Sequence, residues 1–470
     1  MTVEKYKIAT SYQRSTRLDV DLSHLMFEKL ILHESYKELI DKIVGQYESG
    51  QHAFTLTGPY GGGKSTFAVL LSGLLSSDEK IKKTAEKLLS KKTLNRFRKS
   101  FNSQKNGWVV IKVVSDSDDY ITSLHSAMKN AIDDFWGKRV PKEISNLSKP
   151  RNYNSLIKQF ELVSSYAAKK GGGLIIIYDE LGKVFENAAN NNTDVYFFQV
   201  LSENFNRSKD PCIFLGILHQ AFQEYAKNTS QTIRDDWAKI QGRFIDLPFS
   251  IGIEEVIKLI NNAILGPTAP KVAEDNCKKV VASLNDNRLK NLKNFDKELL
   301  RCWPLNPMTA LLLGPISKRR FGQNERSTFG FLTSQEPFGF KYFLTNKLKK
   351  ENSYNPDMLW DYLKHNLEPA IIVSPDGHKW SEATTTIKRV EDKDVDKHVT
   401  ILKAISIIDL FGKPYGLVAN EKTLKLIFQD ISVNELSHIL KDLRNWSSII
   451  FKKHLDSYAI FSGSDIDLDS

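Results

Sequence analysis

One stretch decides the fold of this 470-residue chain: Gly58-Pro59-Tyr60-Gly61-Gly62-Gly63-Lys64-Ser65. It fits the pattern G-x-x-x-x-G-K-[ST], whose glycines allow backbone N–H groups to turn inward and surround a phosphate. An apolar run at His52–Thr57 precedes the stretch, and another at Ser65–Leu75 follows it. We therefore predict a strand, a phosphate-binding loop and a buried helix, because a chance glycine turn would not be expected to have an apolar run on each side.

The loop is expected to bind ATP together with Mg²⁺. Lys64 would reach the β- and γ-phosphates, the Ser65 hydroxyl would be a Mg²⁺ ligand, and Thr66 would contact the α-phosphate. The positive end of the following helix would face the same phosphates. The remaining nucleotide-binding positions are Gly58, Pro59, Tyr60, Gly61, Gly62 and Gly63.

Four further apolar runs are expected strands: Trp108–Val114, Leu174–Tyr178, Cys212–Leu218 and Phe244–Phe249. Helical stretches separate them. Strands that are apolar on nearly every position are typical of a parallel sheet with helices on both faces. The sequence thus predicts an α/β fold of the P-loop NTPase class.

Two acids follow the strand Leu174–Tyr178 directly. Asp179 would hold the Mg²⁺ through water. Because side chains alternate along a strand, Glu180 would point to the other side and polarise the attacking water. Glu180 is therefore the residue that argues for hydrolysis rather than binding alone. The plainer alternative is a strand that simply ends in solvated acids.

Other polar positions near strand ends are candidates for the same site. His219 and Gln220 follow the strand Cys212–Leu218, where either would project beside the γ-phosphate or simply begin a helix. Arg243 comes just before the strand Phe244–Phe249 and is a candidate arginine finger for a neighbouring subunit. The alternative for Arg243 is a surface residue in an ion pair. Lys183 either lies near the site or is an exposed structural lysine, and the second alternative is favoured.

The chain is expected to divide into five parts. They are an N-terminal segment (1–50), the ATPase core (51–264), a helical lid (265–350), a connector with little pattern (351–395) and a last domain (396–470). The last domain contains three helical patterns followed by two short strands, which is the order of a winged helix. Those patterns are Val399–Phe411, Glu421–Phe428, Ser432–Trp446, Ser448–Lys452 and Ser457–Phe461.

Composition narrows the class of protein. Hydrophobic residues make up 41% and charged residues 26%, as in a globular protein. No apolar run approaches the ~20 residues of a membrane helix, and the N-terminus lacks the apolar core of a secretory signal. The cysteines form no C-x-x-C, so neither a disulfide framework nor a zinc site is indicated. We expect a cytoplasmic protein with no membrane association.

The net charge of +10 is unevenly distributed. Residues 76–105 hold ten basic and three acidic residues, with the periodicity of a helix that has a basic face. Such a face either attracts phosphates or an acidic partner, or is merely solvated. The third helix of the expected winged helix has mixed charge, whereas a DNA-reading helix is usually more basic. DNA is a candidate partner through Lys452, Lys453 and His454, but packing or protein contact is favoured there.

Taken in this order, the elements resemble an AAA+ ATPase of the origin-recognition or STAND clade over most of residues 20–470. Residues 302–313 (CWPLNPMTALLL) and 321–332 (FGQNERSTFGFL) are similar to lid segments of large ATPases from bacterial phage-defence islands, such as BREX systems. Residues 457–468 resemble the end of their winged helix. The resemblance implies that Arg326 is the lid arginine that senses nucleotide, with Arg319 and Arg320 as rivals. Those ATPases usually continue for several hundred residues more.

The favoured function is an ATP-hydrolysing switch or motor. It would assemble as a homo-oligomer, or as a hetero-complex with other defence proteins, and act in anti-phage defence or DNA handling. The alternative is a nucleic-acid-binding module that uses ATP as a structural or conformational ligand. A small-molecule kinase would explain neither the lid nor the Asp-Glu pair. The sequence also lacks the L-S-G-G-Q signature of ABC-type ATPases and the further motifs of a helicase.

Overall fold

The computed structural model describes residues 6–9, 18, 22–30, 32, 34–59, 63–102, 106–114, 119–191, 195–227, 229–249, 251–319, 328–348 and 352–461. The chain forms two compact units, and we describe each by itself. One unit is Ser15–Ile251, and the other combines Met1–Arg14 with Gly252–Ser470. The boundary at 251/252 lies earlier than the expected end of the ATPase core at 264, because helix α13 (Ile253–Ala263) belongs to the second unit.

The first unit is built on a five-stranded parallel sheet in the order β3-β4-β5-β2-β6. All five predicted strands are therefore confirmed. β4 and β5 are buried at every position, which explains their uninterrupted apolar sequences. The strands are β2 (Ala53–Thr57), β3 (Val109–Val114), β4 (Leu174–Asp179), β5 (Cys212–Leu218) and β6 (Ile245–Pro248).

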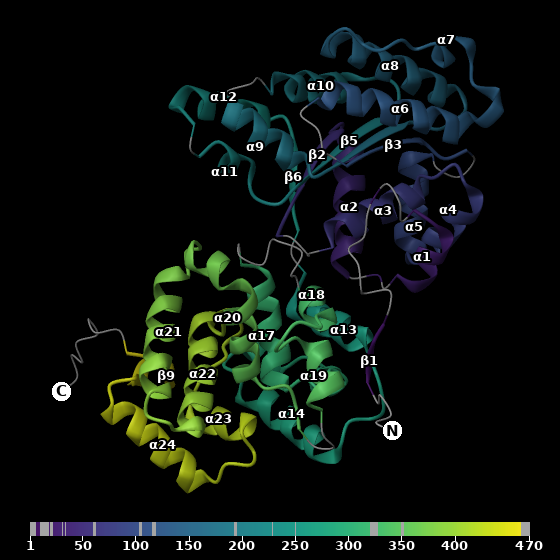
Figure 1. Cartoon of the computed structure of the whole chain (residues 1–470). Coiled ribbons are helices and arrows are strands. Elements are labelled where there is room, and N and C mark those ends of the chain that lie inside the picture. Colours follow the sequence, from purple (N-terminus) through teal and green to yellow (C-terminus); the bar gives the residue numbers. More distant parts are fainter. Residues whose placement is uncertain are drawn as a thin grey trace. The chain divides into compact units, whose positions relative to one another are not determined.

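Helices cover both faces of this sheet, as predicted (Figure 1). On one face lie α6 (Tyr120–Trp136), α8 (Tyr153–Lys169) and α10 (Tyr196–Arg207), and on the other α2 (Glu34–Glu48) and α3 (Lys64–Leu74). The fold is thus that of an α/β P-loop NTPase. The remaining helices of this unit are α1 (His24–Lys29), α4 (Glu79–Glu86), α5 (Lys91–Phe101), α7 (Lys142–Ser145), α9 (Leu181–Asn191), α11 (Phe222–Tyr225) and α12 (Gln231–Gln241).

The basic segment forms two helices, not the single helix that its periodicity suggested. Asp78 caps α4 by accepting the backbone N–H groups of Lys80 and Ile81, and Ser90 caps α5 by accepting that of Thr93. A side-chain cap satisfies backbone donors that lack a partner at a helix start, so a second cap permits a second helix.

The second unit is mostly helical. The N-terminal strand β1 (Lys7–Ile8) pairs antiparallel with β7 (Ile264–Leu265), which places the start of the chain in this unit. After α13 the helices are α14 (Lys271–Ser283), α15 (Asn287–Lys290), α16 (Phe295–Leu300), α17 (Pro307–Ser317), α18 (Thr328–Thr333) and α19 (Phe340–Asn346). Within the described ranges, no helix is both long and apolar enough to cross a membrane.

The segment 351–395, in which we found little pattern, is also helical. It forms α20 (Pro356–Ile372) and α21 (Gly377–Glu391). Their packing includes the stacked rings of Trp360 and Trp380, whose centroids are 4.1 Å apart. Pro369 lies inside α20 and interrupts the sequence pattern of a helix, which explains why this segment was not recognised.

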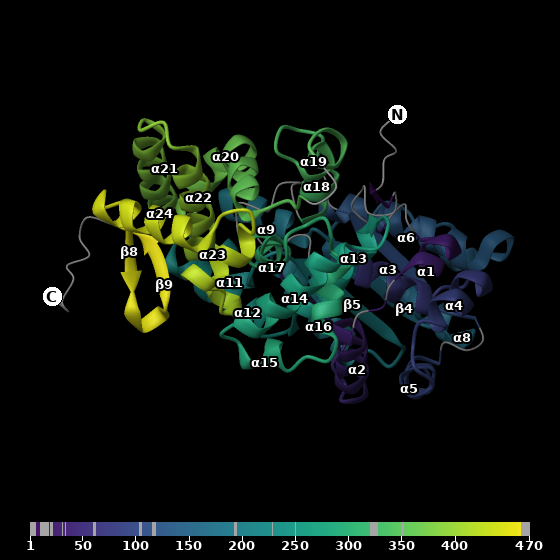
Figure 2. The same cartoon turned by 90° about the horizontal axis from the view of Figure 1, so that it is seen from below.

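The elements of the expected winged helix occur in the predicted order (Figure 2). They are α22 (Asp396–Phe411), α23 (Glu421–Ile427), α24 (Val433–Asn445) and the strands β8 (Ile449–Lys452) and β9 (Ser457–Ile460). β8 and β9 form an antiparallel hairpin. α22 is buried at most of its positions and is the central helix of this group.

Candidate nucleotide-binding site

The predicted loop and the predicted acids meet at one edge of the parallel sheet. The loop follows β2, His219 follows β5, and Asp179 ends β4; β5 lies between the other two strands. Thr57 of β2 pairs with Leu218 of β5, and the Gly58 N–H donates to the Leu218 carbonyl oxygen at 3.2 Å. Because parallel strands end at the same edge, three segments distant in sequence converge here.

Both described ends of the loop require glycine. A Cβ on Gly58 would lie 2.1 Å from the carbonyl oxygen of Phe249. Gly63 has φ +87°, in the left-handed region, and a Cβ there would lie 2.3 Å from the Tyr36 hydroxyl oxygen. The sequence pattern therefore reflects real steric needs at these two positions. Tyr60, Gly61 and Gly62 lie outside the described residues.

Tyr36 supports the loop from helix α2, a role that the sequence analysis missed. Its hydroxyl donates a hydrogen bond to the Gly63 carbonyl oxygen at 2.9 Å. Its buried ring stacks on Phe249, with centroids 5.5 Å apart, and contacts Phe67 of α3. The Phe249 N–H in turn donates to the Thr57 carbonyl oxygen at 2.7 Å. Tyr36 and Phe249 thus contact both ends of the loop.

Lys64 is buried and aims its amine into the loop. Its Nζ donates to the carbonyl oxygens of Gly58 at 2.6 Å and Pro59 at 2.7 Å. Burial lowers the pKa of Lys64 to about 8, and the nearby Asp179 carboxylate partly opposes this shift. A cation held there at neutral pH suits the phosphates that the loop is expected to bind.

Asp179 and Ser65 form the candidate Mg²⁺ site. Burial raises the pKa of Asp179, while a hydrogen bond from the Ser65 hydroxyl and another from the Glu180 N–H, at 2.9 Å, act in the opposite direction. A hydroxyl and a carboxylate are hard oxygen ligands of the kind that Mg²⁺ prefers, so these residues fit the ion. Among the described residues, no group of three or more His, Cys, Asp and Glu side chains could hold a metal. The remaining ligands would then be phosphate oxygens and water. Thr66 lies half-buried in the first turn of α3.

Glu180 lies in a strained turn between β4 and α9. Its φ of +56° is rare for a residue with a Cβ, and such strain clusters at functional sites. Its carboxylate is 2.5 Å from the Nζ of Lys183, which is one turn further along α9. Lys183, for which the structural role was the favoured alternative, is therefore a neighbour of the proposed catalytic acid.

His219 is the polar residue that the end of β5 brings to the site. Burial lowers its pKa to about 3, and the positive charges of Lys64 and Lys183 add to this effect. The imidazole is thus neutral at physiological pH and lies within electrostatic reach of both lysines. Its backbone N–H donates to the Tyr225 hydroxyl oxygen at 3.1 Å. Gln220 is the next residue and is partly exposed.

Arg243 lies at the opposite edge of the sheet. It precedes β6, whose first residue, Ile245, pairs with Phe54 near the start of β2. Its side chain is 52% exposed, and its Nε is 3.2 Å from Oε1 of Glu203. Since the loop follows the other end of β2, Arg243 does not join the nucleotide site of its own chain.

Of the three candidate lid arginines, one lies among the described residues. Arg319, in the second unit, pairs with Asp376 at 3.3 Å and lies over the ring of Phe411. Arg320 and Arg326 lie outside the described residues. A nucleotide-sensing role for any of the three stays a prediction.

Comparison with solved structures gives distant likenesses across most of the chain. One is to the structure of the Aeropyrum pernix ORC2 protein in ADPNP–ADP complexes: 10% identity, TM-score 0.36, covering 93% of this chain and 92% of that one. Another is to the crystal structure of a DNA replication initiation factor: 11% identity, TM-score 0.30, covering 89% and 96%. No protein-family model and no curated protein matches the chain. Likenesses at this level do not bear on function.

Proposed function

We propose that the chain binds ATP with Mg²⁺ and hydrolyses it, as a switch or motor of the AAA+/STAND type. The observation that carries the proposal is the convergence of Lys64, Asp179 and His219 at the carboxyl edge of the sheet, next to a loop whose ends require glycine. A loop of this kind placed before a helix N-terminus is an anion site, and the acids beside it supply what a triphosphate with Mg²⁺ needs.

Each side chain would have a distinct task. Lys64 would exchange its bonds to the Gly58 and Pro59 carbonyls for bonds to the β- and γ-phosphates. Ser65 and Asp179 would hold Mg²⁺, which neutralises phosphate charge when bound. Their oxygen atoms already lie within hydrogen-bonding reach of each other.

The hydrolytic step would depend on Glu180, which would orient and polarise the attacking water. Lys183 would fix the Glu180 carboxylate through their ion pair until that water arrives. A neutral His219, with Gln220 beside it, would offer hydrogen bonds to the γ-phosphate or the water without competing for the negative charge.

Arg243 would act in trans at the γ-phosphate of a neighbouring subunit, either in a homo-oligomer or in a hetero-complex. Its place at the sheet edge away from its own loop supports this, because an arginine there reaches only another chain's phosphates. It would stabilise charge that develops on transfer. The resemblance of the lid and C-terminal segments supports anti-phage defence or DNA handling as the setting, with Arg326 of the lid as the residue that senses nucleotide.

The alternative is a nucleic-acid-binding module that holds ATP without significant turnover. One observation favours it: the Glu180 carboxylate is engaged in an ion pair with Lys183. Glu180→Gln separates the two functions. If the chain is an ATPase, this variant should bind ATP as the parent does and release phosphate at least ~100-fold more slowly, as expected for general-base work.

The matched control is Glu186→Gln, which removes the same charge from α9, the helix that follows Glu180, and also lies near Lys183. It should hydrolyse ATP at nearly the parental rate. Lys64→Ala should bind ATP at least ~tenfold more weakly in a calorimetric titration, since a charge-assisted contact is worth about 1.5–3 kcal/mol. Unchanged affinity in Lys64→Ala would reject the nucleotide site. Normal turnover in Glu180→Gln would reject the assignment of Glu180.

A further inference from the structure

The helices α4 and α5 form a strongly basic corner of the first unit. Nine basic and two acidic residues lie between Glu79 and Phe101. α4 packs on α1 and α3, and α5 packs on α2. Apolar side chains such as Ala85, Phe97 and Phe101 fill the buried face. Most of the charged side chains are therefore left on the outer face of both helices, although Lys82 and Glu86 of α4 are buried.

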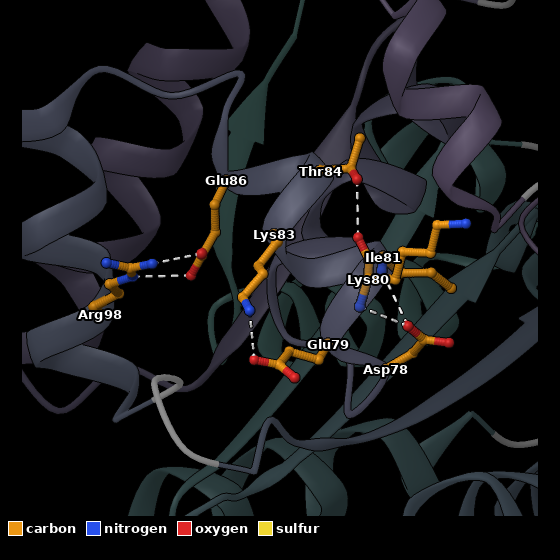
Figure 3. A network of polar contacts seen from close by, with 8 residues as sticks. All are labelled: Asp78, Glu79, Lys80, Ile81, Lys83, Thr84, Glu86 and Arg98. Carbon is orange, nitrogen blue, oxygen red and sulfur yellow. Dashed lines mark hydrogen bonds and ion pairs between the residues drawn. The ribbon is translucent and has the colours of Figure 1, made fainter.

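The acids of this corner are all engaged (Figure 3). Lys83 pairs with Glu79 at 2.7 Å, and Arg98 donates two hydrogen bonds to Glu86, at 2.9 and 2.5 Å. The Asp78 carboxylate caps α4. On the neighbouring face of α5, Arg96 is tied to Glu48 of α2 at 2.7 Å. Three of the nine cations are thereby neutralised within the first unit.

Lys99 is exposed near Glu48, and a further four exposed lysines lie outside these pairs: Lys80, Lys87, Lys91 and Lys92. Within the part of the chain that the structure describes, no hydrogen bond or ion pair is made by their amines. Lys87 is the residue that directly follows α4, and Lys91 and Lys92 begin α5, so these three residues are close along the chain. Lys80 lies two turns back along α4, about 10 Å along the helix axis. We call these four residues the lysine corner.

Helix stability does not explain this arrangement. The first turn of α5 contains two lysines and no acid. Cations near a helix N-terminus are disfavoured by the helix dipole, which prefers acids there. Four unpaired cations so close together also repel one another, and that repulsion is relieved only by an external anion or by salt.

We propose that the lysine corner binds double-stranded DNA through its phosphate backbone. A duplex presents a phosphate every ~3.4 Å of axis on each strand, so a surface about 10 Å long faces several at once. Lysine is a flexible point charge that suits backbone contact without reading bases. The lysine corner would be the surface that contacts DNA if the chain acts in DNA handling. This contact would need neither ATP nor the nucleotide site.

The chemistry of the corner disfavours other partners. None of the exposed large hydrophobic side chains among the described residues lies between Glu79 and Phe101. Single-stranded nucleic acid is bound largely by stacking on aromatic rings, which are not offered here. A membrane surface needs inserted apolar side chains for firm binding, and a protein partner needs a buried anchor.

The test is a salt titration of DNA binding by the full chain without nucleotide. Anisotropy of a labelled duplex gives the dissociation constant, and four phosphate contacts predict that log K falls against log salt with a slope of about −3.6. The variant Lys80→Gln/Lys87→Gln/Lys91→Gln/Lys92→Gln should lose most of this slope and bind at least ~tenfold more weakly at low salt. Its thermal unfolding temperature should not fall, since the substitutions relieve repulsion between the cations and remove no stabilising contact.

The matched control removes the same charge from four other exposed lysines of the unit: Lys138, Lys142, Lys158 and Lys209. It should keep the parental slope. An equal loss in the control would overturn the proposal, because binding would then follow net charge alone. So would a parent chain that binds duplex DNA without salt dependence, or one that binds single strands or anionic vesicles more tightly through the same lysines. Because the titration contains no ATP, a negative result would reject DNA binding by the lysine corner and would not count against the proposed ATPase activity.

Discussion

Substituting Tyr36 by Phe tests whether α2 sets the shape of the phosphate-binding loop. The change removes only the hydroxyl that donates to the Gly63 carbonyl at 2.9 Å, and the ring can keep its stacking on Phe249. A neutral hydrogen bond contributes about 0.5–1.5 kcal/mol net, which corresponds to about two- to twelvefold in an equilibrium constant. If that bond holds the loop ready for phosphate, ATP should bind Tyr36→Phe weaker by this factor.

Calorimetric titration with ATP–Mg²⁺ measures the change in affinity, and thermal unfolding measures the change in stability. Tyr47→Phe is the matched control, because Tyr47 is on the same helix, stacks on His52 and contacts Phe101, away from the loop. Tyr36→Ala should lose more than Tyr36→Phe, since it also removes the contact with Phe249. If Tyr36→Phe lowers the unfolding temperature but leaves ATP affinity within twofold of the parent, the reasoning is refuted and Tyr36 only packs.

Three other substitutions have defined outcomes. Gly63→Ala should destabilise the unit by at least ~1–2 kcal/mol and abolish ATP binding, because its φ is +87° and its Cβ would meet Tyr36; parental denaturant unfolding would contradict this. Arg243→Ala should lower turnover at high protein concentration with unchanged ATP affinity, whereas Glu203→Gln, which removes the charge that pairs with Arg243, should not lower it; turnover per chain that is flat over a hundredfold concentration range would exclude the trans role. Burial and the nearby Asp361 raise the pKa of Asp357 from 3.8 to about 7, so the folded state holds a proton that the unfolded chain loses, and stability falls as pH rises through this window. Asp357→Asn should therefore be more stable than the parent at pH 8, by up to about 4 kcal/mol, with the gain vanishing near pH 4; an equal gain at both pH values would disprove the linkage.

Local sequence pattern was sufficient for the loop and for the five strands, because a buried parallel strand leaves an unbroken apolar run and a phosphate loop needs glycine at fixed places. The contact of Tyr36 with Gly63 joins residues 27 positions apart and follows from packing, so no pattern near either residue signals it. The helical pattern of 351–395 was missed because Pro369 interrupts it within α20, although the helix itself continues and Trp360 and Trp380 stack on each other. The partnership of Glu180 with Lys183 depends on a left-handed φ that sequence does not reveal.

ATP binding and ATP hydrolysis would be separable in this chain, because the nucleotide-binding residues and the proposed arginine finger lie at opposite edges of the sheet. Lys64, Ser65, Asp179 and His219 are together at the carboxyl edge of the sheet, within reach of one nucleotide. Arg243 is at the amino edge, paired with Glu203, and no small movement of a side chain brings it to that nucleotide. A single chain would therefore hold ATP without the cation that stabilises charge in the transition state. If Arg243 is the finger, turnover depends on a neighbour that presents this edge, and the Arg243–Glu203 pair must open when that neighbour docks.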